Sequence, residues 1–509
     1  MNSWLNDRFV ALMKKRYGEE SDSFFLELIQ SARDGHLCLF KKNAPLALSE
    51  TTSDVTFPLE PIVRSKDRYY LQRNWVYESE ICRHVARLNQ TKKTDPTIFH
   101  QEMLLPSQIR AAQHALAHQL TMISGGPGTG KTYTAGHIIR ALASSFDVKR
   151  LYKVTLTAPT GKAAQHLQSS LVSLDLPLQI QTETLHRTLG LTPGKSKLFS
   201  SSLIDADVVV VDEASMIDVD LWAHLLEAIG SETKLIILGD PDQLPPVEAG
   251  SVFSDLSDVF GVHLDRCMRT DRKELLDLSH AICQGNFEET LQKLQAGIGE
   301  FAPIDPEFLF QKLSLPLFEK EPDPTACLDF FRHFKILSAL RQGPWGTDHL
   351  NALFLKLYQR KFRSGRFWAA PILISSNDPR LGLYNGSGGV LIGSCSTFFN
   401  PREATAYFPD SLSGEIRSFS PASLPHYEWG FCLSIHKSQG SEFDHVFAIF
   451  PEGSERFGRE ALYTAATRAK KSLKLAIQPQ ILKEMLSGQC RKESGIVSRM
   501  SELLRGSAP

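Results

Sequence analysis

The stretch "ISGGPGTGKTYTAGHII", residues 123–139, decides the fold of this chain. Its centre, residues 125–132, matches the pattern GxxxxGK[ST], in which the backbone amides of a glycine-rich loop surround the phosphates of a nucleotide. An apolar, strand-like run precedes the loop and a helix-like pattern follows it, as this pattern requires. A glycine-rich turn that merely caps a helix is the alternative. The stretch therefore predicts a nucleotide-binding α/β domain, but it leaves open what hydrolysis accomplishes.

The residue types of this loop indicate its chemistry. Lys131 is expected to reach the β and γ phosphates, and the Thr132 hydroxyl is expected to bind Mg²⁺. ATP and Mg²⁺ are thus the predicted cofactors. The loop residues expected to surround the nucleotide are Gly125, Gly126, Pro127, Gly128, Thr129, Gly130, Lys131 and Thr132.

Three further apolar runs extend this domain. They are "YKVTLTAPT" (152–160), "ADVVVVDEAS" (206–215) and "TKLIILGDPDQ" (233–243), and each ends in a polar loop. Nearly continuous Val, Ile and Leu runs suit a parallel sheet that is covered on both faces. Such sheets bind ligands at the carboxyl ends of their strands. Residues 101–268 are therefore predicted to form one α/β domain with its site along that edge.

Charged and amide side chains at these strand ends are the candidate catalytic groups. Asp212 is placed to hold Mg²⁺, and the adjacent Glu213 to take a proton from the attacking water. Gln243 is a candidate sensor of the γ-phosphate. Arg269 and Arg468 are candidates for stabilising charge on the transferring phosphoryl group. The alternative is an acidic helix cap for the two carboxylates, a proline-stiffened turn for Gln243 and a surface cation for each arginine.

A second series of apolar runs predicts a second α/β domain, residues 269–386 and 427–509. The runs lie at 334–340, 370–378, 445–450 and 472–478. Residues 387–426 have short strands and turns, and they are predicted to form a small β insertion. Residues 1–100 are predicted to form a mainly helical N-terminal domain, joined by a polar linker at 89–102.

The bulk composition limits the class of protein. No apolar run approaches the ~20 residues of a membrane span, and the N-terminus does not have the form of a signal peptide. The eight cysteines form no CxxC pair, which argues against a zinc or iron–sulfur site, and a reducing cytoplasm is the expected location. The net charge of −1 excludes a basic field over the whole protein but permits a local basic groove.

The order of motifs resembles a superfamily-one helicase, and more narrowly the RecD family, the alpha subunit of exodeoxyribonuclease V. The motifs are GGPGTGKT, TAPTGKAA, TLHR, DEAS, GDPDQLPPV, LDRCMR, IHKSQGSEF and YTAATRA. The stretches at 68–81, 337–351 and 377–389 also resemble that family, so the resemblance covers most of the chain. It implies two RecA-like motor domains, an SH3-like fold for 387–426, a possible strand-separating pin at 187–203 and 5′→3′ translocation on single-stranded DNA.

The same resemblance implies roles for further residues. Gln108 matches a position that reads the adenine, and Glu442 matches one that contacts the ribose. Ser434 and Ala466 are mild departures from the family pattern. The positions implied to contact single-stranded DNA or to couple it to ATP are Pro159, Thr160, Lys162, His186, His436, Lys437, Ser438, Gln439 and Gly440.

The resemblance also implies partners. They are DNA ends and RecB-like and RecC-like subunits in a heterotrimer that processes double-strand breaks, with the nuclease on a partner subunit. No helix-hairpin-helix arrays precede the motor, which favours a subunit over a solitary helicase. Residues 1–100 are expected to bind these partners, and deletion of residues 1–95 is expected to spare the ATPase. A nucleotide-gated scaffold and an RNA translocase are the competing hypotheses.

Overall fold

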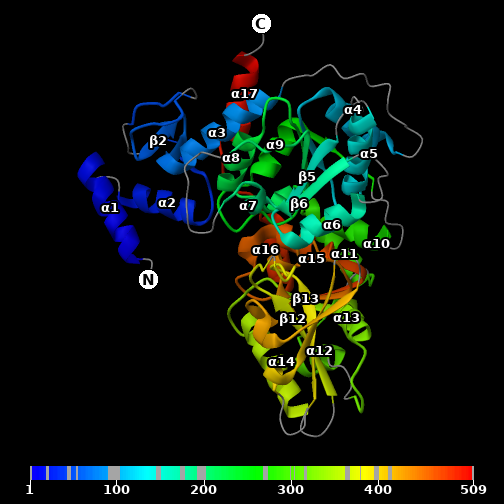
Figure 1. The fold of residues 1–509 in the computed structure, drawn as a ribbon. Coiled ribbons are helices and arrows are strands. Elements are labelled where there is room, and N and C mark those ends of the chain that lie inside the picture. The colour runs from blue at the N-terminus through cyan, green and yellow to red at the C-terminus, as the bar shows by residue number, and fades with distance from the viewer. Residues whose placement is uncertain are drawn as a thin grey trace.

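The computed structural model describes the chain from residue 3 to residue 506 with gaps. The described residues are 3–18, 22–42, 48–52, 55–89, 104–144, 151–171, 178–191, 202–266, 273–297, 300–302, 304–313, 318–361, 367–378, 380–394, 400–410 and 415–506. Arg269, the linker residues 90–102 and residues 192–201 of the predicted pin lie outside them. Figure 1 shows the first α/β domain above the second, with the N-terminal region at the side of the first.

The first α/β domain is built on a parallel sheet, as predicted. In its described part the strand order is β6-β5-β7-β8-β4-β9, and every neighbouring pair is parallel. The strands are β4 (Leu120–Ser124), β5 (Tyr152–Ala158), β6 (Leu178–Thr184), β7 (Val208–Val211), β8 (Lys234–Gly239) and β9 (Gly261–His263). All side chains of β7 and β8 are buried, which explains the apolar runs that end in the candidate catalytic residues.

Alternate residues of the central strands pack on opposite layers of helices. Val208 and Val210 lie in one hydrophobic cluster with helices α4 (Pro106–Ala117), α5 (Lys131–Ser144) and α6 (Gly161–Leu171). Val209 and Val211 lie in the other, with α8 (Val219–Ala228) and α9 (Val252–Phe260). Successive side chains of a strand point to opposite faces, so one apolar run supplies both cores.

Helix α3 (Gln72–Leu88) belongs by its packing to the first α/β domain, although the sequence analysis placed it in a separate N-terminal domain. Its Tyr77, Ile81 and Val85 lie in the same hydrophobic cluster as Trp222 of α8. Each of these four side chains is at most 1% exposed. Deletion of residues 1–95 would remove this wall of the core, and its effect on the ATPase stays a prediction.

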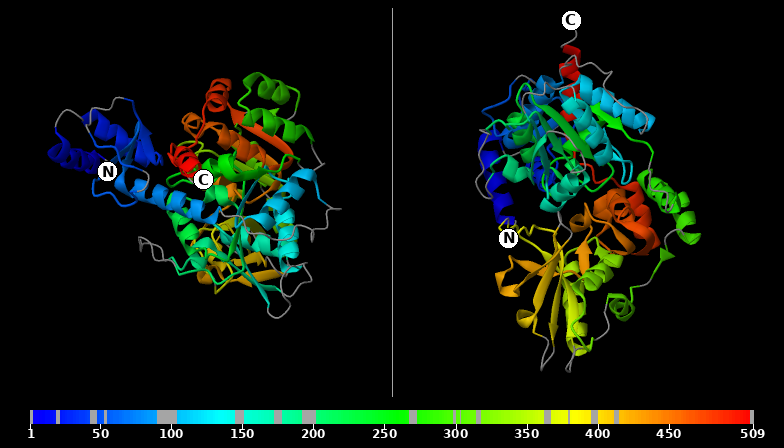
Figure 2. Two further views of the ribbon diagram at one scale, coloured as in Figure 1. Left: turned by 90° about the horizontal axis from the view of Figure 1, so that it is seen from above. Right: turned by 45° about the vertical axis from the view of Figure 1, so that its right-hand side comes forward.

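The remaining N-terminal residues form a small unit that projects from the body (Figure 2, left). It contains helices α1 (Ser3–Tyr17) and α2 (Asp22–Arg33) and an antiparallel sheet in the order β1-β3-β2. The strands are β1 (Cys38–Phe40), β2 (Ile62–Ser65) and β3 (Arg68–Leu71). Phe24, Phe25 and Tyr69 are buried in its core.

The second α/β domain also has a parallel sheet, in the order β10-β19-β18-β11-β17 over its described strands. The strands are β10 (Glu300–Phe301), β11 (Phe334–Ser338), β17 (Cys432–Ser434), β18 (Phe443–Phe450) and β19 (Ala469–Ile477). The helices are α10 (Lys273–Cys283), α11 (Phe287–Gln295), α12 (Pro306–Leu313), α13 (Pro324–His333), α14 (Thr347–Lys361), α15 (Gly458–Ala466) and α16 (Pro479–Ser487). Helices α10, α11, α15 and α16 cover one face, whereas α12 and α14 share a core with the β insertion on the other.

The β insertion is larger than predicted. Its sheet has the order β15-β14-β13-β12-β16, and all pairs are antiparallel. The strands are β12 (Phe367–Ile374), β13 (Gly388–Ser394), β14 (Thr405–Pro409), β15 (Ile416–Phe419) and β16 (Tyr427–Trp429).

The run at 370–378 was predicted to join the second parallel sheet, and this was wrong. It lies in β12, which pairs antiparallel with β13 from Phe367↔Ser394 to Leu373↔Gly388. Helix α13 and the second domain bury β12, so it has the continuous apolar pattern that is otherwise typical of a parallel strand. Gly389 and Gly393 leave room for two aromatic rings, since a Cβ there would lie 2.4 Å from Phe408 and 2.7 Å from Trp368.

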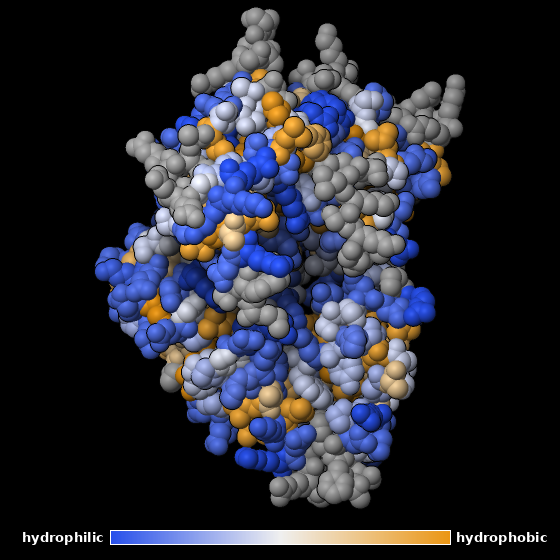
Figure 3. Space-filling model, turned by 90° about the vertical axis from the view of Figure 1, so that its left-hand side faces the viewer, coloured by the Kyte–Doolittle hydropathy of each residue, from blue (hydrophilic) through white to orange (hydrophobic). Residues whose placement is uncertain are grey.

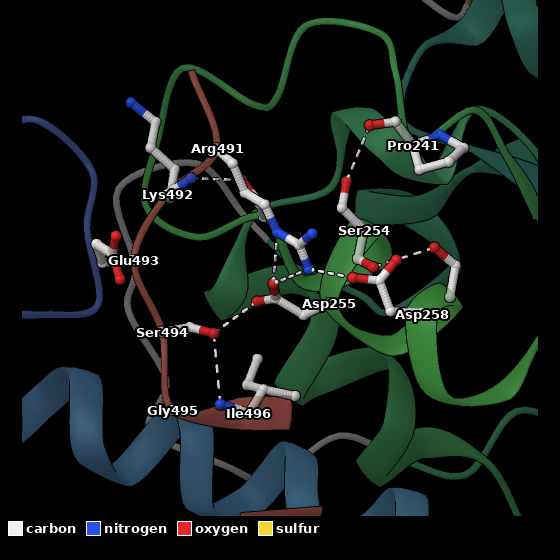
Figure 4. Close-up of polar contacts among 12 residues, drawn as sticks. Pro241, Ser254, Asp255, Asp258, Arg491, Lys492, Glu493, Ser494, Gly495 and Ile496 are labelled. Atoms are coloured by element: carbon white, nitrogen blue, oxygen red, sulfur yellow. Dashed lines mark hydrogen bonds and ion pairs between the residues drawn. The ribbon is translucent and has the colours of Figure 1, made fainter. Parts of the chain in front are cut away.

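The C-terminal segment leaves the second α/β domain and returns to the first. After α16, residues 488–495 cross to α9, and α17 (Ile496–Gly506) packs against α3 and α9. Arg491 forms ion pairs with Asp255 at 2.9 Å and Asp258 at 2.7 Å, as Figure 4 shows. The predicted second domain therefore ends near α16, not at residue 509.

Short elements complete the described chain. They are helix α7 (Leu185–Thr188) and the 3₁₀ helices η3 (Ala214–Met216), η4 (Pro401–Glu403), η5 (Pro421–Ser423), η6 (His436–Ser438) and η7 (Glu455–Phe457). Among the described helices, none has both the length and the apolar character needed to cross a bilayer.

Candidate nucleotide and nucleic-acid site

The phosphate loop joins β4 to α5 and has the backbone that its glycines predict. Gly128 and Gly130 have φ of +77° and +82°, which residues with a side chain rarely adopt. A Cβ at Gly125 would lie 2.8 Å from the Thr129 hydroxyl and 3.0 Å from the Leu264 carbonyl oxygen. The loop is therefore compact, with its amides at the N-terminus of α5, where the helix dipole favours an anion.

Lys131 is the first residue of α5 and folds back over this loop. Its Nζ donates to the carbonyl oxygens of Gly125 at 2.6 Å and Gly126 at 3.1 Å. Its positive charge lowers the pKa of Asp212 and Asp240, which opposes the effect of their burial. The ammonium group thus lies between the loop and the carboxylates, where a nucleotide phosphate would meet it.

Gln108, expected to read the adenine, packs against the same loop. Its Nε2 donates to the Thr129 carbonyl oxygen at 3.1 Å, and its Oε1 accepts from the Leu105 amide at 3.0 Å. The side chain is buried and adjoins Gly130, where a Cβ would lie 2.6 Å from Nε2. It holds the start of α4 to the loop, and the adenine contact stays a prediction.

Asp212 and Glu213 follow β7, as the sequence predicted. Asp212 Oδ1 accepts from the Glu213 amide at 2.8 Å. Burial raises the pKa of Asp212, whereas Lys131, that amide and the Thr132 hydroxyl act to lower it. Thr132 and Asp212 therefore face each other, and a hydroxyl beside a carboxylate is an oxygen pair of the kind that Mg²⁺ prefers. The residues present fit the metal site that the loop implies.

Glu213 has an unusual backbone. Its φ of 53° and ψ of 39° are left-handed, and in the described chain only Lys66 shares a positive φ among residues other than glycine. Such a conformation costs about 1–3 kcal/mol and is often found at active sites. It places the carboxylate beside the second α/β domain, since a Cβ at Gly440 would lie 3.7 Å from Glu213 Oε1. Burial and the charge of Asp212 raise the pKa of Glu213, which suits a proton acceptor.

A hydrogen-bond network at Asp240 joins the two domains, and the sequence analysis missed it. The buried Asp240 carboxylate accepts from Gln243 Nε2 at 3.0 Å and from the Tyr463 hydroxyl at 3.0 Å. Tyr463 also lies over the phosphate loop, because a Cβ at Gly126 would be 2.9 Å from its Oη. A phenol among the small residues of "YTAATRA" was the signal that could have found it.

Gln243 and the residue after it link this network to residues 436–440, the loop predicted to couple DNA to ATP. The Leu244 amide donates to Thr464 Oγ1 at 2.9 Å, and the Leu244 carbonyl accepts from Gln439 Nε2 at 3.0 Å. Gln243 Oε1 is buried and has no hydrogen-bond partner among the described residues. An orphaned buried acceptor costs stability, so a donor from the nucleotide site or a water would satisfy it.

Arg468 is buried, which rules out the surface-cation alternative for this residue. Only 3% of it is exposed, and its guanidinium donates to the carbonyl oxygens of Thr464 and Ser441 at 3.1 Å each. Burial and Asp212 raise the pKa of Glu213, and the charge of Arg468 partly offsets this rise. A buried cation facing the candidate base of the other domain is well placed to stabilise charge on a phosphoryl group.

Five of the predicted DNA contacts line one cleft between the two domains. They are Thr160, Lys162, His436, Lys437 and Gln439, and Pro245, Pro246 and Asn385 also line it. The Ser438 side chain is instead buried and donates to the Ile435 carbonyl at 2.7 Å, so it does not face the cleft. Pro159 and the exposed His186 are not part of the cleft lining, and Glu442 forms an ion pair with Lys470 at 3.5 Å.

Two family models match the chain. Residues 103–298 match the AAA domain family, and residues 430–476 match the UvrD-like helicase C-terminal domain family. These segments contain the phosphate loop and the Arg468 region, respectively.

Two relatives and a solved structure are similar to the chain. The RecBCD enzyme subunit RecD of Mycolicibacterium smegmatis is 31% identical over 85% of this chain and 82% of that protein. The ATP-dependent RecD2 DNA helicase of Deinococcus radiodurans is 26% identical over 83% of this chain and 57% of that protein. The crystal structure of Pif1 helicase from Bacteroides in complex with ADP-AlF3 and ssDNA is 17% identical, with a TM-score of 0.45 over 80% of this chain and 99% of that one.

Proposed function

The chain belongs to the RecD family of ATP-dependent DNA helicases, and we propose that its two α/β domains are motor domains that move it 5′→3′ along single-stranded DNA. One observation carries this proposal: groups from both domains converge on the phosphate loop. Tyr463 of the second domain lies over Gly126, and Arg468 of the second domain faces Glu213 of the first. ATP between the domains would therefore contact both, and its loss would weaken the attraction between them.

The chain's residues divide the work of hydrolysis. The loop amides and Lys131 hold the β and γ phosphates, and Thr132 and Asp212 would hold Mg²⁺, which when bound neutralises charge on the phosphates. Glu213 takes a proton from the attacking water at its carboxylate. Arg468 supplies positive charge where negative charge grows on the phosphoryl group.

The contact between Gln439 and Leu244 is the proposed route from ATP to DNA. Leu244 follows Gln243, whose side chain is bonded to Asp240 in the ATP site. Gln439 lines the DNA cleft and donates to the Leu244 carbonyl at 3.0 Å. A movement of Gln243 on ATP binding or product release would therefore shift η6 relative to the single-stranded DNA in the cleft.

We further propose that the chain is a subunit of a larger assembly that processes DNA ends, with RecB-like and RecC-like subunits. The similarity supports this, since the chain is 31% identical to the RecBCD enzyme subunit RecD and 26% identical to the RecD2 helicase. The N-terminal unit also exposes large apolar side chains: Leu59 at 93%, Leu12 at 66% and Phe57 at 60%. Figure 3 shows the face on which this unit lies, where hydrophobic groups are interspersed among hydrophilic ones. Contiguous apolar patches mark partner surfaces, and we propose that these three side chains contribute to one.

Two measurements on the full chain test the proposed function. Single-stranded DNA should strongly stimulate ATP hydrolysis, and a duplex with a 5′ single-stranded tail should be unwound whereas one with a 3′ tail should not. Unwinding of only the 3′-tailed duplex would show that the chain moves 3′→5′ instead. Stronger stimulation by RNA would favour an RNA translocase, and indifference to any nucleic acid would favour a nucleotide-gated scaffold.

A further inference from the structure

A second pocket adjoins the DNA cleft, and its charged groups all have one sign. It lies where α6, α13 and β11 meet the β insertion, and it shares Lys162, Lys437 and Ser441 with the cleft. Its other charged lining residues are Arg332 and Lys335. No aspartate or glutamate is among the described residues that line it.

Lys335 is the most deeply buried of these cations. Only 6% of it is exposed, on strand β11 of the second motor domain. Its Nζ donates to the Gly430 carbonyl at 2.9 Å and lies 5.7 Å from the centre of the Phe443 ring. The pKa of Lys335 is lowered to about 8, mainly by burial; Cys432 acts to raise it, and the charge of Lys162 acts to lower it. A buried charge without an anionic partner is costly, so this lysine needs an explanation.

Lys162 approaches the same pocket from the first motor domain. Its Nζ donates to Ser441 Oγ at 2.5 Å. The pKa of Lys162 is lowered to about 8, mainly by burial and also by the charges of Arg332 and Arg468, whereas Glu442 acts to raise it. Two lysines from different domains therefore repel each other across one pocket. An anion between them would remove this repulsion and favour both charged forms.

Most of the other lining residues are apolar or aromatic, and Gln165, Ser387 and Ser441 are polar but uncharged. The apolar wall includes Phe331, Phe408 and Leu433, together with glycines of the segment 382–389 that leave the wall free of side chains. The space amounts to about 950 Å³ including its open mouth. Aromatic and apolar walls accept a base of any sequence by stacking and contact. The pocket thus combines a cationic end with an apolar one.

We propose that this pocket receives one nucleotide of the single strand, with its phosphate held by Lys162 and Lys335 and its base against the apolar wall. The inference rests on the proposed DNA helicase function and adds a binding site beside the cleft. Because Lys162 and Lys437 line both spaces, a strand that lies in the cleft reaches the pocket without leaving the protein surface. The site spans the two motor domains, so its shape depends on how closely they approach.

The variant Lys335→Met tests this proposal. It removes the charge but keeps an unbranched side chain, and it replaces a buried cation by an apolar group, so the protein should stay folded, as thermal unfolding will show. The DNA concentration for half-maximal ATPase stimulation should rise several-fold. The slope of log affinity against log salt should become shallower by about 0.7, the value for one phosphate contact on a single strand. Lys335→Arg should restore both.

Lys483→Met is the matched control, because Lys483 is an exposed lysine on α16 of the same motor domain, outside the pocket. It should leave both quantities unchanged. If wild-type ATPase responds to DNA but Lys335→Met behaves as wild type, the pocket does not hold the strand. A Lys335→Met effect on binding of a free nucleoside monophosphate, with none on single-stranded DNA, would also overturn the proposal. If wild-type ATPase ignores DNA, the proposed function itself fails.

Discussion

The Tyr463 hydroxyl of the second motor domain donates a 3.0 Å hydrogen bond to the Asp240 carboxylate of the first. That carboxylate also accepts from Gln243, the candidate γ-phosphate sensor. The three groups are buried, and burial raises the pKa of both Tyr463 and Asp240. A change in the distance between the two domains must therefore alter the carboxylate to which Gln243 is hydrogen-bonded.

Tyr463→Phe should lower the DNA-stimulated kcat about tenfold while changing the KM for ATP little. A hydrogen bond to a charged group contributes about 1.5–3 kcal/mol, and here its loss frees Gln243 without removing a phosphate contact. Steady-state ATPase kinetics measure both constants. Tyr358→Phe is the control, because Tyr358 also donates a buried hydrogen bond, to the Leu313 carbonyl, far from the nucleotide. Equal losses in the two variants would mean that Tyr463 has a merely structural role.

Lys131→Ala should reduce DNA-stimulated hydrolysis by about 100-fold or more, because the cation that faces the phosphates is lost. The fold should survive, since the Lys131 ammonium bonds only to loop carbonyls among its described hydrogen-bond partners. Circular dichroism and ATPase assays on the purified protein check this. Lys153→Ala, which removes an exposed cation paired with Asp205 in the same domain, should behave as wild type. Near-normal turnover in Lys131→Ala would refute the site.

Glu213→Gln should slow hydrolysis by about 10²–10⁴-fold while nucleotide binding is retained, because only the proton acceptor is lost. It should also raise the melting temperature of the nucleotide-free protein at neutral pH. The pKa of Glu213 is raised in the folded state, so its contribution to stability is lost as pH rises through that pKa. Asp212→Asn should instead weaken Mg²⁺-dependent nucleotide binding. Failure of Glu213→Gln to bind ATP would contradict this division of roles.

DNA affinity should fall as pH rises through about 8, because the pKa values of Lys162 and Lys335 are lowered to about that value and phosphate binds their charged forms. Without DNA the sign is opposite. A lysine whose folded pKa lies below its unfolded value costs stability at low pH, and this cost disappears as pH rises from about 8 towards the unfolded value of about 10.4. Lys335→Met should flatten both profiles. Titration of binding and of chemical unfolding between pH 7 and pH 10 measures them.

Leu59→Asp should weaken copurification with the partner subunits and leave DNA-stimulated ATPase intact. Leu59 is 93% exposed, so a charged side chain there costs the isolated chain little. Leu151→Asp is the control, because Leu151 is 53% exposed but lies in the first motor domain. If Leu59→Asp copurifies with the partner subunits at full yield, the apolar surface of the N-terminal unit is not part of the interface.

Local sequence by itself predicted the candidate nucleotide site. The glycines, Lys131 and Thr132 form a loop whose backbone is set by neighbours along the chain, and Asp212 and Glu213 directly follow a buried strand. Each arrangement depends on a few consecutive residues, and residue type and spacing suffice to describe it. The parallel sheet of the first domain follows for the same reason, because its strands are buried on both faces and read as continuous apolar runs.

Only the tertiary structure decided which distant segments meet. A buried strand has the same apolar pattern in either direction, so the antiparallel pairing of β12 depended on the partner that reached it. The apolar face of α3 showed that the helix packs but not against which core, and α8 decided that. The contacts of Tyr463 with Asp240, and of Lys162 and Lys335 with one pocket, join residues of different domains. Such contacts depend on how the whole chain is folded, which no local pattern records.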